Sequence, residues 1–251
     1  MKTLPDNSID ACITDPPYYS TNLHFDKEPR IDFEYLLHEI KRILKPAGVL
    51  VSFADFNLLA ELRGYKVFKS TYELIWQKNM ATGMLNCNDR PLKNHEFIGV
   101  FTSSFKKSTY NPIKFNFQSS RFKVGESNKA SGLPATSLYG NYADKSEYIE
   151  NGTRHPLSIV YAQNWNGGIA RDVAKGNKRH PTQKPLDLLE WLVKSYTNEN
   201  DIILDPFAGS GTTLVAAKNL SRRAIGCELH EPYYEIAKAR IENAKQQQDL
   251  F

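Results

Sequence analysis

The stretch ITDPPYYS, residues 13–20, places a carboxylate, two prolines and two aromatic rings directly after a short apolar run. An amino group conjugated to a ring is a poor nucleophile, and a carboxylate together with a carbonyl can accept its hydrogen bonds as the nitrogen becomes tetrahedral. Asp15 supplies the carboxylate, while Pro16 and Pro17 fix the direction of a carbonyl. Tyr18 offers a flat face for a planar base that has been flipped out of its helix. The pattern predicts a site for attack by an exocyclic amino group, with an ordinary Asp-Pro-Pro turn as the alternative.

A second stretch, LDPFAGSGTT at residues 204–213, joins an acid to two glycines ahead of an expected helix. Gly209 and Gly211 let the backbone turn tightly and approach a ligand at a helix N-terminus, and Glu228, after the next apolar run, could hold two ribose hydroxyls. A phosphate-binding P-loop would need a lysine after Gly211, and a dinucleotide fingerprint would need a glycine where Leu214 stands. The stretch therefore predicts a nucleoside-cofactor site, with a purely structural turn as the alternative.

Apolar periodicity defines the elements that must position these two stretches. Helical spacing predicts helices at residues 32–44, 58–64, 185–197, 210–220 and 232–248. Short apolar runs predict strands at residues 9–14, 48–54, 72–78, 95–101, 201–207 and 223–229. Strands that alternate with helices predict an α/β fold with a mainly parallel, doubly wound sheet. Both stretches then lie at carboxyl ends of strands, where open α/β sheets bind their ligands.

The positive charge of the chain is concentrated in residues 103–179. This segment holds 12 Lys and Arg against 5 Asp and Glu, an excess of +7, whereas the whole chain carries only +4. Its cations alternate with aromatic rings, a combination that attracts a polyanion carrying bases, although a solvated basic loop is the alternative. Its periodicity is weak, which predicts a loop-rich insertion and not a continuation of the sheet. The cations expected to contact a nucleic acid are Lys106, Lys107, Arg121, Lys123, Arg154 and Arg179.

Cysteine usage and hydropathy exclude several classes of protein. The three cysteines are widely spaced and form no CxxC pair, so we expect neither a disulfide framework nor a metal site. Cys12 lies inside an expected strand and is predicted to be a core residue and not a nucleophile. No stretch approaches the ~18 apolar residues of a membrane span. We expect a soluble, cytoplasmic protein.

The order of the motifs resembles that of the β-class DNA amino-methyltransferases, in particular the bacterial and phage adenine-specific enzymes. Asp-Pro-Pro-Tyr comes first, followed by a variable region, HPTQKP at 180–185, DPFAGSGTT at 205–213 and GCEL at 226–229. The resemblance covers nearly the whole chain. It implies a Rossmann-like class I methyltransferase sheet with circularly permuted motif order, DNA as the partner and S-adenosylmethionine as the cofactor. The implied reaction is methylation of the exocyclic N6 amino group of adenine after base flipping.

The resemblance also assigns roles to segments and residues. It implies that residues 1–102 form the catalytic half of the methyltransferase domain, 103–179 a target-recognition insertion and 180–251 the cofactor-binding half. The implied catalytic residues are Asp15, Pro16, Pro17 and Tyr18. The implied cofactor-binding residues are Asp205, Phe207, Gly209, Ser210, Gly211, Thr212 and Glu228, with Thr182 and Lys184 at the methionine carboxylate.

Two other functions stay open at this point. A cytosine-N4 methyltransferase would use the same site geometry, although Asp rather than Ser at position 15 favours adenine in this family. The second alternative is a cofactor-deficient DNA-binding remnant, because relatives carry a strand ending in Gly-Asp before the equivalent of residues 4–10. This chain begins at Met1, so we expect that strand to be missing and one sheet edge to be uncovered. A homodimer and a cognate restriction endonuclease are further candidate partners.

Overall fold

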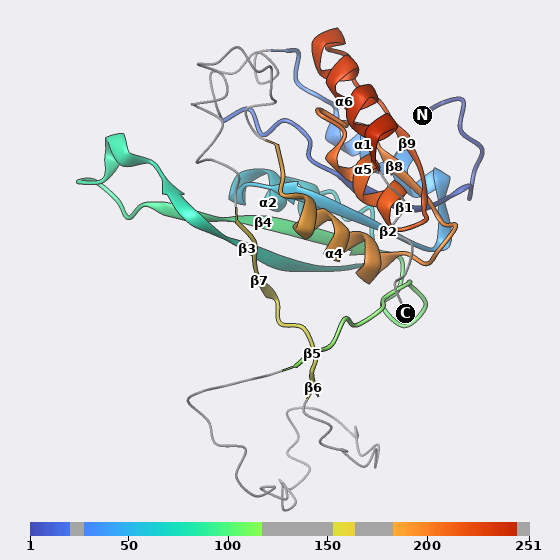
Figure 1. The fold of residues 1–251 in the computed structure, drawn as a ribbon, viewed down its shortest axis with the longest axis horizontal. Helices are drawn as coiled ribbons and strands as arrows, with labels where there is room; N and C mark the ends of the chain where they lie inside the picture. Colours follow the sequence, from blue (N-terminus) through green and yellow to red (C-terminus); the bar gives the residue numbers. More distant parts are fainter. Residues whose placement is uncertain (21–27, 117–152, 164–182, 245–251) are drawn as a thin grey trace, which may run out of the picture. The chain divides into compact units, whose positions relative to one another are not determined.

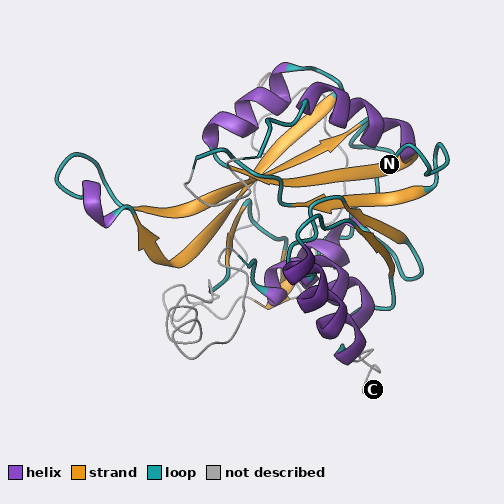
Figure 2. Ribbon diagram, turned by 90° about the horizontal axis from the view of Figure 1, so that it is seen from above, coloured by secondary structure: helices purple, strands orange, loops and turns teal. Residues whose placement is uncertain are grey.

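The computed structural model describes four stretches of the chain, residues 1–20, 28–116, 153–163 and 183–244. The chain divides into two compact units, of which the first combines Met1–Asn111 with Leu157–Phe251 and the second is Pro112–Pro156. The first unit is built on one sheet with helices on both of its faces (Figures 1 and 2). In the second unit, the described residues form a two-residue antiparallel pair, β5 (Phe115–Asn116) with β6 (Thr153–Arg154).

The sheet of the first unit has seven strands in the order β7-β3-β4-β2-β1-β8-β9. Strand β4 is antiparallel to β2 and β3, whereas the other four pairings are parallel. The predicted α/β fold with a mainly parallel sheet is thus confirmed. The strands are β1 (Ile9–Thr14), β2 (Leu44–Ala54), β3 (Ser70–Thr82), β4 (Lys93–Thr102), β7 (Ile159–Tyr161), β8 (Ile202–Asp205) and β9 (Arg223–Gly226).

The five α-helices of the described residues match the helices expected from apolar periodicity. Asp32 and Asp55 cap the first two helices, because their side chains accept the backbone N–H groups of Tyr35 and Leu58. Pro185 directly precedes α4, where its missing N–H is no loss. The helices are α1 (Phe33–Ile43), α2 (Phe56–Gly64), α4 (Leu186–Tyr196), α5 (Thr212–Asn219) and α6 (Glu231–Asn243). A short 3-10 turn, η2 (Met84–Asn86), lies in the β3–β4 connection.

The core consists of two apolar layers, one on each face of the sheet. Successive side chains of a strand point to opposite faces, so Ile13 packs in the layer covered by α4 and α5, whereas Cys12 packs in the layer covered by α1 and α2. Cys12 is fully buried, which confirms that it is a core residue. Burial raises the pKa of its thiol well above the usual value, so the sulfur stays protonated and is not a nucleophile.

Part of the expected insertion continues the sheet. Strand β7 falls within residues 103–179 and pairs in parallel with β3, Ile75 lying opposite Ile159. The expectation that this segment leaves the sheet entirely was therefore wrong for β7, because a three-residue strand is too short to show periodicity. At the opposite end of the strand order, all four residues of β9 are exposed.

The pairing of β1 with β8 brings the two chemically interesting stretches together. The strands are parallel, with Cys12 opposite Leu204, so their carboxyl ends lie at the same edge of the sheet. Asp15 follows β1 and Asp205 ends β8. The hydroxyl of Thr14 donates a hydrogen bond of 2.8 Å to the Asp205 carboxylate across this junction.

Candidate active site

The Asp15 carboxylate lies between a phenol and an ammonium group. Tyr18 donates its hydroxyl to one carboxylate oxygen at 2.7 Å, and Lys184 donates its Nζ to the other at 2.5 Å. The Asp15 side chain keeps 25% of its surface exposed, so a ligand can still reach it. Burial raises the pKa of Asp15 above its usual value, and the Lys184 charge only partly opposes this effect. The group is a carboxylate whose basicity is increased by its surroundings.

Two charged residues behind Lys184 complete the cluster, and they were not among the predicted site residues. Glu96, on β4, lies 3.5 Å from Lys184 Nζ, and Lys78, on β3, donates a hydrogen bond to Glu96. Burial lowers the pKa of Lys184, but the charges of Asp15 and Glu96 outweigh burial, so its pKa lies above the usual value. The signal that could have revealed Glu96 is an acid at the start of the apolar run EFIGVF, since charges are rarely buried unless paired.

Aromatic rings surround the cations of this cluster. Lys184 Nζ lies 5.0 Å from the centre of the Phe53 ring, and Lys78 Nζ lies 4.8 Å from that of Trp76. Trp76 is itself fixed, because its indole N–H donates to the carbonyl of Ala162 at 2.9 Å. Cation–π attraction and the rigid rings restrict where the two ammonium groups can move.

The second carboxylate, Asp205, is buried and held by its own loop. It accepts hydrogen bonds from the Thr14 hydroxyl at 2.8 Å and from the backbone N–H of Phe207 at 3.1 Å. Burial raises the pKa of Asp205 to about 6. This carboxylate fixes the start of the glycine-containing turn relative to the end of β1.

The glycine turn that follows has the backbone that only glycine adopts readily. Gly209 and Gly211 have φ angles of 52° and 75°. A Cβ on Gly211 would also lie 2.9 Å from Ala237 Cβ on α6, so the turn can pack against that helix only with glycine at this position. The predicted role of the two glycines in forming a tight turn before α5 has a direct geometric basis.

Glu228 follows β9 and faces the same turn. Its two carboxylate oxygens accept the backbone N–H groups of Gly209 and His230, each at 2.8 Å. A carboxylate has about four acceptor sites, so two remain for the hydroxyls of a ribose. The side chain is half-buried, which leaves it accessible at this edge.

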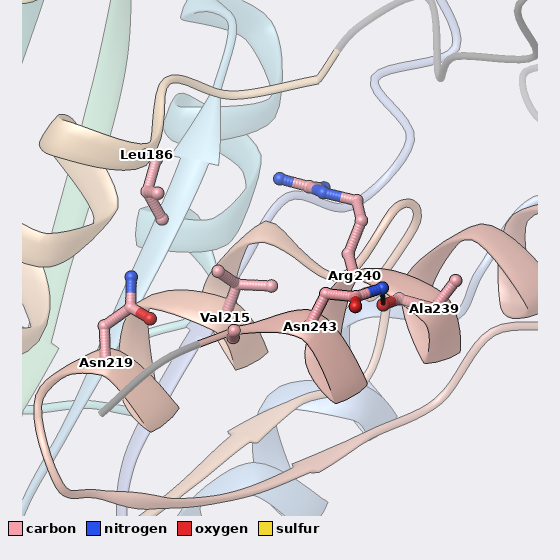
Figure 3. Close-up of a pocket in the computed structure, with 7 residues that line it drawn as sticks. Leu186, Val215, Asn219, Ala239, Arg240 and Asn243 are labelled. Atoms are coloured by element: carbon pink, nitrogen blue, oxygen red, sulfur yellow. Dashed lines mark hydrogen bonds between the residues drawn. The ribbon is translucent and has the colours of Figure 1, made fainter. Parts of the chain in front are cut away.

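Ser210 and Thr212, also predicted to bind the cofactor, are engaged by α6. Arg240 donates to the Ser210 hydroxyl at 2.8 Å and to the Thr212 hydroxyl at 3.0 Å. Both serine and threonine are buried. Figure 3 shows Arg240 again in a pocket that none of the predicted site residues lines, formed by Leu186, Val215, Asn219, Ala239, Arg240, Asn243 and Ala244.

The predicted DNA-binding cations are only partly described. Lys106 and Lys107 are exposed in the turn after β4. Arg154 belongs to β6 of the second unit. Arg121, Lys123, Arg179 and the predicted cofactor residue Thr182 lie outside the described residues. Within the described part of the chain, no group of three or more His, Cys, Asp or Glu side chains could hold a metal ion, and no helix has the length and apolar character to cross a membrane.

Comparison with known proteins identifies the family. The family model for DNA methylases matches residues 9–239, nearly the whole chain. The chain belongs to the DNA methylase family. The sequence resemblance to the DNA amino-methyltransferases is thereby confirmed, and with it a methyltransferase that acts on DNA and uses S-adenosylmethionine.

Individual relatives and structures agree with this assignment. The putative methylase YubD of Escherichia coli is 38% identical over 96% of this chain and 85% of its own length, and the Type II methyltransferase M.HpaI of Haemophilus parainfluenzae is 31% identical over 97% and 71%. The PvuII cytosine-N4-specific DNA methyltransferase has a TM-score of 0.65 at 17% identity, covering 98% of this methylase and 84% of that chain. The M1.HpyAVI–SAM complex has a TM-score of 0.56 at 24% identity, covering 95% and 90%. These structures confirm the class I methyltransferase fold.

Proposed function

We propose that this methylase is a site-specific enzyme that methylates the N6 amino group of adenine in DNA. The observation that carries the proposal is the adjacency of Asp15 and the glycine turn at one sheet edge, joined by the Thr14–Asp205 hydrogen bond. An acceptor for an amino group and a loop suited to a nucleoside cofactor thus meet where β1 and β8 end. Asp rather than Ser at position 15 favours adenine over cytosine.

Asp15 and its neighbours supply positioning and a proton acceptor. The amino group of the flipped base donates to Asp15 and to the carbonyl of Pro16, which directs the nitrogen lone pair out of the ring plane. S-adenosylmethionine, when bound, supplies a methyl group on a positively charged sulfur. With the cofactor in place, the nitrogen would gain positive charge as it takes the methyl group from the sulfur, and it would then lose a proton, which Asp15 is suited to accept because its pKa is raised.

The residues at the glycine turn fit the cofactor. Gly209 and Gly211 allow close approach to the backbone, Glu228 has free acceptor sites for the ribose hydroxyls, and half-buried Phe207 offers an aromatic face. Lys184 is bonded to Asp15, and its neighbour Gln183 accepts a hydrogen bond from the Ser210 hydroxyl of the glycine turn at 3.2 Å, so this segment contacts both stretches. We assign the methionine carboxylate of the cofactor to Lys184 together with Thr182. For Asp205, we propose that it acts by holding the turn.

We assign target recognition to residues 103–179. Lys106 and Lys107 are exposed and suited to phosphate contacts. Replacing both by alanine should weaken binding to all DNA sequences alike and reduce the salt dependence by about one unit of slope per lost contact.

Exchanging the whole segment 103–179 with that of a relative should instead change the methylated sequence. If the chimera keeps the parental sequence, specificity lies elsewhere, for example in the exposed β3–β4 turn at 81–91.

A cytosine-N4 methyltransferase is the second candidate, since the PvuII enzyme named above shares the fold and the amino group of cytosine could use the same acceptors. The deciding experiment incubates DNA free of methylated bases with the enzyme and isotopically labelled S-adenosylmethionine and separates the nucleosides by chromatography. Labelled N6-methyladenine is the expected product, and labelled N4-methylcytosine would establish the second candidate. DNA binding without methylation, together with no heat of cofactor binding in calorimetry, would identify a DNA-binding remnant.

The candidate protein partners and the location stay part of this proposal. We expect a cytoplasmic enzyme, because its substrate is DNA. Sedimentation with and without DNA would show whether it is a homodimer. A cognate restriction endonuclease would cut unmethylated DNA at the sequence that this methylase protects.

A further inference from the structure

An uninterrupted series of alternating charges leads from Asp15 into the protein. Asp15 bonds to Lys184 at 2.5 Å, Lys184 lies 3.5 Å from Glu96, and Glu96 accepts a hydrogen bond from Lys78. The side chains of Lys184, Glu96 and Lys78 are only 10%, 16% and 13% exposed. Four charges on two strands and two loops thus share one poorly hydrated site, where their interactions are strong.

One atom of this series has an unused capacity to accept a hydrogen bond. The Oε2 of Glu96 is buried and has no hydrogen-bond partner among the described residues, although Lys184 Nζ is 3.5 Å away. A buried carboxylate oxygen without a partner is unfavourable, so it attracts any donor that can reach it. Moving Lys184 Nζ by ~0.7 Å toward Glu96 would bring the pair to the usual distance for an ammonium–carboxylate hydrogen bond.

We propose that Glu96 is a positioning residue that takes Lys184 from Asp15 when the amino group of the target base binds. The inference rests on the proposed function, because it concerns the acceptor of that amino group. An ammonium group on Asp15 neutralises the charge that must stabilise the positive nitrogen formed during methyl transfer. With Glu96 as the new partner of Lys184, the other N–H groups of this ammonium remain for the carboxylate of the cofactor. The negative charge of Asp15 is then available to the base, and no unpaired ammonium is left in the interior.

The charges around Glu96 suit it to this task. Burial raises the pKa of Glu96, but the charges of Lys184 and Lys78 outweigh burial and hold it below the usual value. Glu96 therefore stays ionised whichever carboxylate Lys184 contacts. Lys78 keeps its place over the Trp76 ring at 4.8 Å and balances the charge of Glu96.

The test compares Glu96→Gln, which keeps the shape and removes the charge, with Glu96→Asp, which keeps the charge at a greater distance. Glu73→Gln is the matched control, because Glu73 also belongs to this part of the sheet but forms an exposed pair with Arg63 at 3.5 Å. Each variant is assayed for thermal unfolding, for the dissociation constants of S-adenosylmethionine and DNA, and for the single-turnover methylation rate at saturating concentrations between pH 5 and 9.

We expect Glu96→Gln to slow single-turnover methylation at least about tenfold while both dissociation constants change by less than about twofold. The acid limb of its rate profile should move to lower pH, because Glu96 raises the pKa of Asp15 and Lys184 would stay on Asp15 in the variant. The other groups around Asp15 are Tyr18, Lys184 and Asp205, and none of them is altered. Glu96→Asp should recover part of the rate, and its acid limb should lie between those of Glu96→Gln and the unaltered enzyme. It provides the comparison if Glu96→Gln does not fold.

Two results would overturn the inference. One is a rate like that of the control in both Glu96 variants, and the other is a slower rate with an unmoved acid limb, which would indicate a structural role alone. Methylation by the unaltered enzyme is measured first, so a failure of the proposed function is seen separately as the absence of a methylated base. If the methylated base is cytosine, the same comparison applies, because Asp15 would receive that amino group in the same way.

Discussion

Asp15 and Asp205 lie at neighbouring strand ends of one sheet edge, yet their surroundings differ. Asp205 is buried, and its partners are the hydroxyl of Thr14 and a backbone N–H of its own turn, which are fixed by the fold. Asp15 is partly exposed, and its partners are the ends of two side chains, Tyr18 and Lys184, which can shift by rotation about side-chain bonds while the backbone stays in place. A carboxylate with fixed partners holds structure, whereas one with movable partners can exchange them for a ligand. We therefore assign chemistry to Asp15 and positioning to Asp205.

The largest effect that separates the two carboxylates should come from Asp15→Ala. Loss of the amino-group acceptor should reduce methyl transfer by about 10²–10⁴-fold. Affinities for S-adenosylmethionine and DNA, measured by calorimetry and fluorescence anisotropy, should change little, because Asp15 acts on the amino group alone. Equal loss of cofactor affinity would show that Asp15 belongs to the cofactor site instead.

Asp205→Asn should act on stability and in a pH-dependent way. The pKa of Asp205 is raised to about 6 in the folded protein, above the value of about 3.9 for Asp in an unfolded chain. The folded state therefore binds this proton more tightly than the unfolded state. The resulting stability is fully present below about pH 4 and is lost as the pH rises through 6. Asparagine cannot ionise, so the variant should gain up to about 3 kcal/mol relative to the unaltered protein between pH 4 and 7. Denaturant unfolding at several pH values measures this, with Asp89→Asn in an exposed turn as the control; a pH-independent difference would contradict it.

Glu228→Gln should affect the binding of the cofactor and not the binding of DNA. Hydrogen bonds to a charged group contribute about 1.5–3 kcal/mol each, so the cofactor should bind at least about tenfold more weakly. DNA affinity should be almost unaltered. Glu228 also accepts the N–H groups of Gly209 and His230, so the thermal midpoint is measured as well. Reduced stability with unchanged cofactor binding would assign Glu228 a structural role only.

The smallest effect is expected from Tyr18→Phe, which keeps the ring and removes the 2.7 Å hydrogen bond to Asp15. This bond is present before the base binds, so most of its contribution is common to the ground state and the transition state, and the methylation rate should change by less than about tenfold. Tyr18→Ala should in addition weaken capture of the flipped base by about 1–3 kcal/mol, because stacking is lost. A 2-aminopurine probe at the target position reports this step, and equal fluorescence enhancement in both variants would argue against stacking.

Sequence motifs located Asp15 and Asp205 far better than they predicted which side chains form hydrogen bonds and ion pairs around Asp15. Asp15 and Asp205 were recognisable because each follows an apolar run and precedes a proline, and strand β1 was predicted with its observed bounds. The contacts of Asp15 with Lys184 bridge 169 residues, and those of Lys184 with Glu96 depend on the antiparallel position of β4. Local patterns contain no information on such pairings, so Glu96 and Lys78 were missed. The engagement of Ser210 and Thr212 by Arg240 depends in the same way on how α6 packs.

One measurement compares the two carboxylates directly. Single-turnover methylation is followed for Asp15→Asn and Asp205→Asn, which make the same chemical change, at saturating S-adenosylmethionine and DNA. We expect Asp15→Asn to lose at least about a hundredfold in rate and Asp205→Asn to stay within about tenfold of the unaltered enzyme. An active Asp15→Asn enzyme beside an inactive but folded Asp205→Asn enzyme would contradict the division of roles.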